Sequence, residues 1–428
     1  MRKNVSRALM LSSVVISASL LGGCGDDSST QTGGNTSVAL SSLETLGKNL
    51  FFDTNLSTPK GQSCATCHAP ETGFTGPRSD INAAGSVFPG AISTRFGNRK
   101  PPSAAYATQS PLFHFDTTDG LFLGGNFWDG RATGEILGNP AADQALGPFL
   151  NPVEMNMASA QALCDTVAAA SYATLFNDAF PYVTKPIDCT NDVTGTYHRI
   201  GLAIAAFEAS REVNAFTSKY DYYLRGKVQL TAQESAGLAL FQDPLKGNCS
   251  ACHPSTLGPN GELPLFTDFS FDNLGVPKNP ANPFYTMDTV LVNGVPVNPL
   301  GAAWIDKGLG GFLESHTLPS YQTLATANMG KQKVPTLRNI DKRPNQSFVK
   351  AYAHNGYFKS IKEIVHFYNT RDVLPLCTGT AVPGVDCWPA PEVATNVNTD
   401  ELGNLGLTPT EEDALVAFLK TLSDGYLP

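Results

Sequence analysis

The sequence carries few positive charges and no cluster of them. Its 29 lysine and arginine residues are outnumbered by 38 acidic residues, and the formal net charge at pH 7 is −9. Nucleic-acid binding depends on a basic patch or stripe that contacts phosphate groups. The composition therefore argues against a nucleic-acid partner. The acidic balance is compatible with a basic protein partner, although net charge does not identify one.

Runs of alternating polar and apolar residues, which are typical of β-strands, are also scarce. The chain instead contains 39 glycine and 30 proline residues, which favour turns and loops. Short amphipathic helices are recognisable between them. This pattern predicts a mainly α fold in which long loops connect the helices.

Long apolar runs are absent except near the N-terminus, from Ala8 to Leu21. This run is too short and too close to the terminus to be the membrane span of the fold. Arg2, Lys3 and Arg7 precede it, which is typical of a secretory signal. We therefore expect an exported protein.

The signal ends in Leu21-Gly22-Gly23-Cys24, which resembles a bacterial lipobox. This predicts a signal peptide over residues 1–24, a lipid anchor on Cys24, and a flexible tether over 25–40 that is rich in Gly, Ser, Thr and Asp. The location would then be periplasmic or at the cell surface, with membrane contact only through the lipid. The alternative is ordinary cleavage, which leaves a periplasmic protein without an anchor.

Cysteine and histidine are rare, at nine and seven residues, yet they recur in one pentapeptide. Cys64-Ala65-Thr66-Cys67-His68 returns as Cys249-Ser250-Ala251-Cys252-His253. Cys-x-x-Cys-His is the attachment signature of c-type haem, in which the thiols form thioethers and the imidazole binds the iron. A zinc site needs four ligands at finger spacing, and a redox pair needs no following histidine. The sequence predicts two covalently bound haem c groups, with thioethers from Cys64, Cys67, Cys249 and Cys252 and iron ligands His68 and His253.

Four cysteines remain once Cys24 and the haem thiols are set aside. An even number in an exported protein predicts two disulfides. The simplest pairing joins Cys164 to Cys189 and Cys377 to Cys387, and each pair closes a loop. We expect both bonds to be structural.

The chain repeats itself at the scale of a domain. Capping boxes at 41–44 and 231–234 predict helices that reach Phe51 and Phe241, and each helix is followed by a loop and a haem motif. The repeat predicts two cytochrome c-like domains with haem-wrapping loops, an N-terminal domain over 41–228 and a C-terminal domain over 229–428.

Two further helices are predicted outside this repeat. A capping box at 408–411, with proline at the first helical position, predicts a helix through Leu422. An apolar face formed by Ile200, Ala203, Ile204 and Phe207 predicts a helix from Arg199 to Phe216.

Several blocks, in the right order, resemble the bacterial di-haem cytochrome c peroxidase and MauG family. They are Phe127-Trp128-Asp129-Gly130-Arg131-Ala132, Gln144-Ala145-Leu146-Gly147-Pro148, Pro152-Val153-Glu154-Met155, Val334-Pro335-Thr336-Leu337-Arg338-Asn339 and His354-Asn355-Gly356. The resemblance covers nearly the whole mature chain. It implies an oxidoreductase that acts on hydrogen peroxide.

The resemblance also implies catalytic roles for three residues. Glu154 matches the family's acid/base, which moves a proton between the two peroxide oxygens. Gln144 matches a donor that positions peroxide or water. Trp128 matches an indole between the haems that conducts electrons. Without the family, Glu154 reads as a surface carboxylate and Trp128 as a core residue.

The first haem departs from part of the family. Relatives that need reductive activation carry a histidine shortly before a Gly-x-Arg-Asn-x-Pro segment, and residues 91–96, ahead of Gly97, contain none. The first iron is therefore expected to keep an open position, with His114 as the alternative ligand.

Lys100 replaces the asparagine that faces Ca²⁺ in relatives. Although carbonyls near Val349 and Ala351 remain, an ammonium opposes a divalent cation and puts the implied Ca²⁺ in doubt.

The second haem departs as well. Simple peroxidases of this family carry a methionine ligand twelve residues after the glycine of His-x-Gly, and Tyr368 stands there. This is the MauG arrangement, and a phenolate favours ferric iron over ferrous iron. The alternatives are a core tyrosine, with His366 or Met329 as the ligand.

Three functions follow from these features. The first is reduction of peroxide at the N-terminal haem, with electrons passed through the C-terminal haem from a small c-type cytochrome or cupredoxin. The second is MauG-like oxidation of Trp or Tyr in a protein substrate, which Tyr368 favours. The third is a non-catalytic di-haem electron carrier, against which Glu154, Gln144 and the missing histidine argue.

Overall fold

A computed structural model describes residues 39–428. The predicted signal peptide, Cys24 and nearly all of the predicted tether lie outside the described residues. None of the described helices is long and apolar enough to cross a membrane. The prediction of a helix-rich fold is confirmed, since the sheets of the described part are three antiparallel pairs of two short strands.

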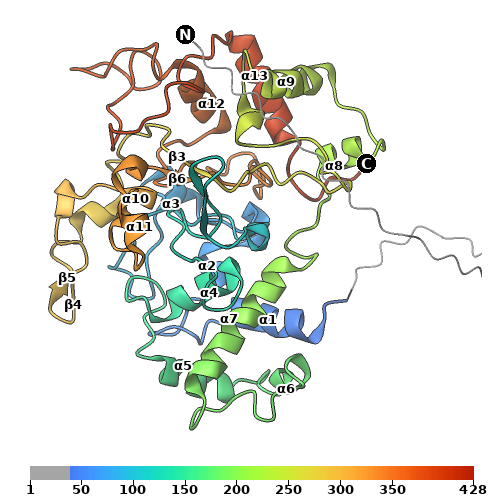
Figure 1. Ribbon diagram of the computed structural model, residues 1–428, viewed down its shortest axis with the longest axis vertical. Coiled ribbons are helices and arrows are strands. Elements are labelled where there is room, and N and C mark those ends of the chain that lie inside the picture. The colour runs from blue at the N-terminus through green and yellow to red at the C-terminus, as the bar shows by residue number, and fades with distance from the viewer. Residues whose placement is uncertain (1–38) are drawn as a thin grey trace, which may run out of the picture. The chain divides into compact units, whose positions relative to one another are not determined.

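Thirteen α-helices are found between residues 39 and 428 (Figure 1). They are α1 (Ser42–Phe52), α2 (Cys64–Cys67), α3 (Ser79–Ala83), α4 (Pro140–Leu150), α5 (Ala160–Ala168), α6 (Leu175–Ala179), α7 (Val193–Ala209), α8 (Lys219–Leu224), α9 (Ala232–Gln242), α10 (Gly308–Glu314), α11 (Pro319–Gln322), α12 (Ile361–Thr370) and α13 (Pro409–Lys420). The strand pairs are β1 (His114–Asp116) with β2 (Leu121–Leu123), β3 (Phe271–Asp272) with β6 (Gln332–Lys333), and β4 (Leu291–Val292) with β5 (Val295–Pro296).

The capping boxes define where three of these helices begin. The side chains of Ser41, Thr231 and Thr408 each accept a hydrogen bond from the backbone N–H three residues on, and the glutamate there accepts one from the cap's own N–H. Each cap thus satisfies two backbone donors that the first helical turn leaves free. These starts are confirmed, and α13 ends at Lys420, two residues before the predicted end.

The predicted helix from Arg199 to Phe216 was wrong in its bounds. The actual helix, α7, begins at Val193, because the Asp192 side chain caps it by accepting the N–H of Gly195. It ends at Ala209, where Ser210 adopts an extended backbone. The predicted apolar face is buried as expected, with Ile200 fully covered.

The internal repeat reappears as two similar helix pairs. In the first pair, Gly47 of α1 lies against the backbone of Ala203 and the Cβ of Phe207 in α7. In the second, Gly237 of α9 lies in the same way against Ala414 and Phe418 of α13. A Cβ at either glycine would overlap the facing helix, so only glycine permits this close crossing.

Two separate hydrophobic cores surround these helix pairs. One is built around α1, α4, α5 and α7, and the other around α9, α12 and α13. Figure 1 shows α9, α12 and α13 together at one end of the described part and α1, α5, α6 and α7 toward the other. Residues 40–428 nevertheless form one compact unit, and the domain boundary near residue 228 stays a prediction.

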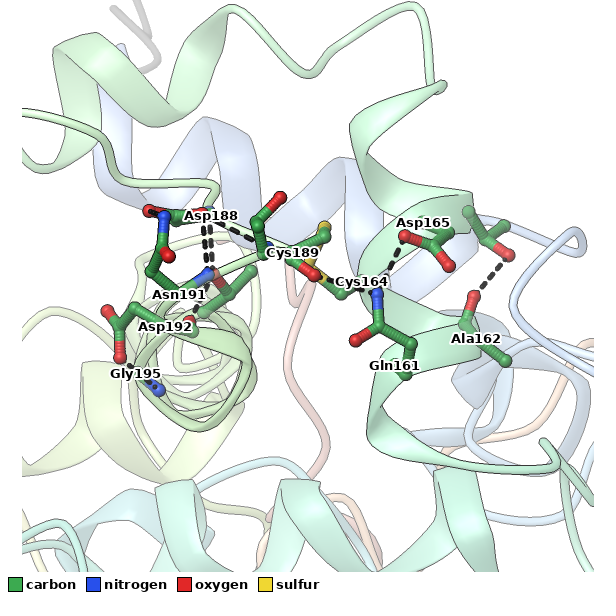
Figure 2. The surroundings of a disulfide bond; sticks show 12 residues. Gln161, Ala162, Cys164, Asp165, Asp188, Cys189, Asn191, Asp192 and Gly195 are labelled. Atoms are coloured by element: carbon green, nitrogen blue, oxygen red, sulfur yellow. Dashed lines mark hydrogen bonds between the residues drawn. A yellow bond between two sulfur atoms is a disulfide. The ribbon is translucent and has the colours of Figure 1, made fainter.

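Both predicted disulfides are present, Cys164–Cys189 and Cys377–Cys387. The first joins α5 to the loop before α7, and Figure 2 shows the surroundings of this bond. There the Gln161 amide donates to the carbonyl of Cys189 at 2.9 Å. Backbone amides of the same loop donate to the Asp188 carboxylate, which therefore holds the turn beside the disulfide.

Removal of the Cys164–Cys189 bond, by changing both residues to alanine, should lower the free energy of unfolding by about 3–4 kcal/mol, because its loop of 25 residues regains conformational entropy in the unfolded chain. The matched double alanine variant of Cys377 and Cys387, with a loop of 10 residues, should lose less. Urea unfolding measures both. A larger loss for the shorter loop would contradict the chain-entropy explanation.

Candidate di-haem site

Each Cys-x-x-Cys-His motif lines its own cavity. The first cavity holds Cys64, Cys67 and His68, and has about 1160 Å³ of space including its mouth. The second holds the corresponding cysteines and His253, with about 1480 Å³. The four motif cysteines are the free cysteines of residues 39–428, so their thiols are available for thioether bonds. Space and donor set both fit a porphyrin in each cavity.

The two motif histidines are held in the orientation that an iron ligand needs. Nδ1 of His68 lies 3.1 Å from the carbonyl oxygen of Phe74, and Nδ1 of His253 lies 2.7 Å from that of Phe266. A hydrogen bond from Nδ1 to a carbonyl leaves Nε2 as the metal-binding nitrogen. Burial lowers the pKa of both rings, that of His68 to about 4, and so keeps them neutral.

The predicted acid/base lies where two cavities adjoin. Glu154 and Gln144 line the first haem cavity and also a neighbouring cavity, called the channel below, which shares His68 with it. The Asn151 amide donates to Oε2 of Glu154 at 2.7 Å. Burial raises the pKa of Glu154, and this bond opposes the shift. A carboxyl tuned in this way and facing a channel is suited to exchange protons with a bound molecule.

A second buried carboxyl in the first cavity was not foreseen from the sequence. Glu208, near the end of α7, is 4% exposed and lines the cavity. Burial raises its pKa to about 8, so it is largely protonated at neutral pH. Glu208 is not among the residues that line the channel. The one available signal was an acidic residue on an otherwise apolar helix face.

Trp128 lines both haem cavities, which is the position that a conductor between two haems requires. Its indole N–H donates to the carbonyl of Lys100 at 2.9 Å. Lys333 also lines both cavities, and its ammonium donates to Ser110 Oγ at 2.6 Å and to Gly125 O. Sequence reasoning missed Lys333, since nothing in the pattern distinguishes it from a surface lysine.

Tyr368 of α12 lines the second cavity together with His253. Burial raises the pKa of its phenol. The two alternative ligands are placed differently: Nδ1 of His366 lies 2.8 Å from a Glu412 carboxylate oxygen, and neither His366 nor Met329 is among the lining residues. The tertiary structure therefore brings Tyr368, and neither alternative, to the cavity.

His114, the alternative ligand of the first iron, is exposed on β1, and its Nδ1 lies 2.8 Å from the Leu112 carbonyl oxygen. Among the described residues that line the first cavity and its channel, His68 is the only histidine.

We therefore expect the fully oxidised protein to contain one high-spin and one low-spin haem, because the first iron lacks a second histidine and Tyr368 is available to the second. Electron paramagnetic resonance of the resting protein measures this. Two low-spin signals would contradict the prediction, and loss of one of them in a His114→Ala variant would identify the unexpected ligand.

The residues near Val349 do not suit the Ca²⁺ ion that the family resemblance implies. The Lys350 amino group donates to the carbonyls of Thr72, Asn339 and Lys342 at 2.8, 2.7 and 3.0 Å. The Val349 carbonyl, one of the oxygens left for a cation, accepts from the Asn82 amide at 3.1 Å. Carbonyls that already accept hydrogen bonds leave few free oxygen ligands for a divalent cation at this place.

Accordingly, neither a chelator nor added Ca²⁺ should change the thermal unfolding midpoint. Lys350→Met should lower the free energy of unfolding by about 3 kcal/mol or more, because three buried carbonyls lose their donor. The exposed Lys307→Met is the matched control. Destabilisation of the native protein by chelation would show that a metal ion does bind.

Two haem-attachment cavities that share one tryptophan define a di-haem c-type protein. A family model for di-haem cytochrome c peroxidase matches residues 41–229. The methylamine utilization protein MauG of Paracoccus denitrificans is 34% identical over 388 residues, 89% of this chain and 88% of that protein. The chain therefore belongs to the di-haem cytochrome c peroxidase and MauG family, whose members carry two covalently bound c-type haems.

Two other relatives agree. A cytochrome-c peroxidase of Denitromonas iodatirespirans is 26% identical over 383 residues, 88% of this chain and 80% of that protein. The crystal structure of the diheme peroxidase BthA from Burkholderia thailandensis has a TM-score of 0.68 and 30% identity, and the match covers 89% of this chain and 86% of that one. The prediction of the family is confirmed.

Proposed function

We propose that this protein cleaves hydrogen peroxide in the first cavity and passes the oxidising equivalents through Trp128 to the second cavity. The observation that carries this proposal is Glu154, a partly buried carboxyl that lines both the first cavity and its channel. An electron carrier needs no such group, because its irons exchange electrons without moving protons to a substrate.

The bound haem iron supplies the redox centre at which the peroxide O–O bond is broken. Glu154 takes a proton from one peroxide oxygen and returns it to the other, which then leaves as water. Gln144 positions the peroxide by hydrogen bonding, and Asn151 keeps the Glu154 carboxyl pointed at the cavity. Two electrons and two protons in all convert the peroxide to two molecules of water.

The origin of those two electrons separates the two enzymatic functions. A small c-type cytochrome or cupredoxin is the donor in the first, and a Trp or Tyr side chain of a protein substrate is the donor in the second. Tyr368 in the second cavity favours the second function, because a phenolate ligand stabilises oxidised iron. The 34% identity with a protein named MauG supports the same choice.

One experiment tests the function and its two forms. Peroxide is added to the diferric protein, and spectra are recorded with and without a reduced small cytochrome. Rapid peroxide loss that leaves the cytochrome reduced supports oxidation of protein side chains, whereas stoichiometric oxidation of the cytochrome supports peroxide reduction. Absence of peroxide consumption under both conditions would contradict the proposed function.

We also propose that the protein works outside the cytoplasm, anchored through a lipid on Cys24. Haem attachment to Cys-x-x-Cys-His motifs and the two disulfides both suit an exported protein. Mass spectrometry of the mature N-terminus tests the anchor. An unmodified terminus would contradict it.

A further inference from the structure

A series of oxidisable and polar side chains leads away from Trp128 on the side of His354. The two rings meet edge to face, with centroids 6.4 Å apart. Nε2 of His354 lies 3.9 Å from Oε2 of Glu392, and both atoms are buried without a hydrogen-bond partner in the described part of the chain. Both residues line the second haem cavity, so these two atoms face the haem site and link its wall to Tyr285.

The other carboxylate oxygen of Glu392 extends this series of side chains to Tyr285. The hydroxyl of Tyr285 donates to Oε1 of Glu392 at 3.2 Å. Tyr285 belongs to η4 (Pro283–Thr286) and is 8% exposed. Burial and the Glu392 carboxylate raise the pKa of Tyr285, so the phenol keeps its proton at neutral pH.

The series of side chains then reaches the protein surface at a second tryptophan. Trp304 directly follows η5 (Gly301–Ala303) and is half-buried. Its indole centroid lies 6.1 Å from that of Tyr285 and 4.9 Å from that of Phe284. Trp388, by contrast, is 2% exposed within the second core, and its N–H is bonded to Thr370. Trp304 is therefore the better placed of the two to exchange electrons with a molecule outside.

We propose that Tyr285 and Trp304 form a relay that carries oxidising equivalents from Trp128 to the protein surface. This inference rests on the proposed function, which supplies peroxide as the oxidant, and it names the place where a protein substrate would be oxidised. The substrate is an exposed Trp or Tyr side chain of another protein that reaches Trp304.

Each step of the relay balances in electrons and protons. Oxidised Trp128 takes one electron from Tyr285, and the phenolic proton moves to Glu392. The Tyr285 radical then takes one electron from Trp304 and recovers the proton from Glu392. Oxidised Trp304 finally takes one electron from the external side chain, so two passages supply the two electrons that one peroxide consumes.

The charges around Tyr285 make the proton transfer necessary. The Lys278 ammonium lies over the Tyr285 ring, 4.0 Å from its centroid. A positive charge at this distance opposes a second positive charge on the ring. Tyr285 can therefore lose an electron readily only if its proton leaves at the same time, and Glu392 is hydrogen-bonded to accept it.

The test uses the haem-loaded full chain, with hydrogen peroxide as the oxidant and no donor. Peptide mass spectrometry should find oxidation products on Trp304, and electron paramagnetic resonance should detect a radical on the chain. Tyr285→Phe should reduce the Trp304 products to the level seen in Glu154→Gln, which cleaves peroxide slowly. Trp304→Phe should instead leave a tyrosyl radical signal, because the Tyr285 radical then has no tryptophan on its outer side from which to take an electron.

A matched control comes from another tyrosine that donates to a carboxylate. Tyr172 donates to Asp53 at 2.6 Å, and Asp53, unlike Glu392, lines neither haem cavity, so Tyr172→Phe should leave Trp304 oxidation unchanged. Equal Trp304 oxidation in Tyr285→Phe and the native protein, with peroxide consumed and both haem spectra intact, would overturn the relay alone. If the native protein consumes no peroxide, the proposed function fails instead and the relay fails with it.

Discussion

Glu154→Gln is expected to slow peroxide cleavage by about 10²–10⁴-fold while both haems stay attached, because an amide cannot accept and return the peroxide proton. The substitution keeps the size of the side chain and its contact with Asn151. Stopped-flow recording of the resting spectrum after peroxide addition measures the rate. An unchanged rate would mean that Glu154 has no acid/base role.

Glu208→Gln is the matched control for this experiment. Both carboxyls line the first cavity, but Glu208 does not line the channel. Burial raises the pKa of Glu208 to about 8, so this carboxyl is largely protonated at neutral pH. A protonated carboxyl cannot accept the peroxide proton. Its variant should therefore cleave peroxide at nearly the native rate. A large loss in Glu208→Gln and none in Glu154→Gln would exchange the two roles.

Tyr368→Met is expected to raise the reduction potential of the second haem by a substantial part of the roughly 0.8 V range over which axial ligands set haem potentials. Thioether sulfur favours ferrous iron, and phenolate oxygen favours ferric iron. Oxidation of a protein substrate should fall in this variant, because the second haem then stores oxidising equivalents less well. Peroxide reduction with an external donor should survive.

Redox titration of the two haems decides this prediction. Tyr352→Phe provides the control, since Tyr352 lines the same cavity and its hydroxyl donates to the Ile340 carbonyl at 3.2 Å. In Tyr352→Phe the reduction potential of the second haem should stay close to that of the native protein. If the potential of Tyr368→Met does not move either, Tyr368 is not an iron ligand, and the preference for protein oxidation loses its main support.

Haem attachment was predictable from the sequence because it depends on a local pattern. The spacing of Cys64, Cys67 and His68 lies within one helical turn, so no knowledge of the tertiary structure is needed to recognise it. The capping boxes at Ser41, Thr231 and Thr408 are local in the same sense, and all three were confirmed. The bounds of α7 were missed because an apolar face gives the phase of a helix but not its ends.

The reaction site was only partly predictable, and the resemblance to a family was needed for it. Glu154, Gln144 and Trp128 are distant from both haem motifs in the sequence, and the fold places all three on the wall of the first cavity. Their catalytic roles remain proposals. No local pattern distinguishes such residues from surface or core residues, because their function depends on what they face.

The sequence by itself determined the two haem groups, the family and the pairing of four cysteines. Only the tertiary structure decided that Glu208 shares a cavity with Glu154, that Asn82 occupies the Val349 carbonyl left for a cation, and that Tyr285 connects Glu392 to Trp304. The physical reason is that burial, which sets the pKa of a carboxyl and the cost of an unpaired charge, arises from packing between segments far apart in the chain.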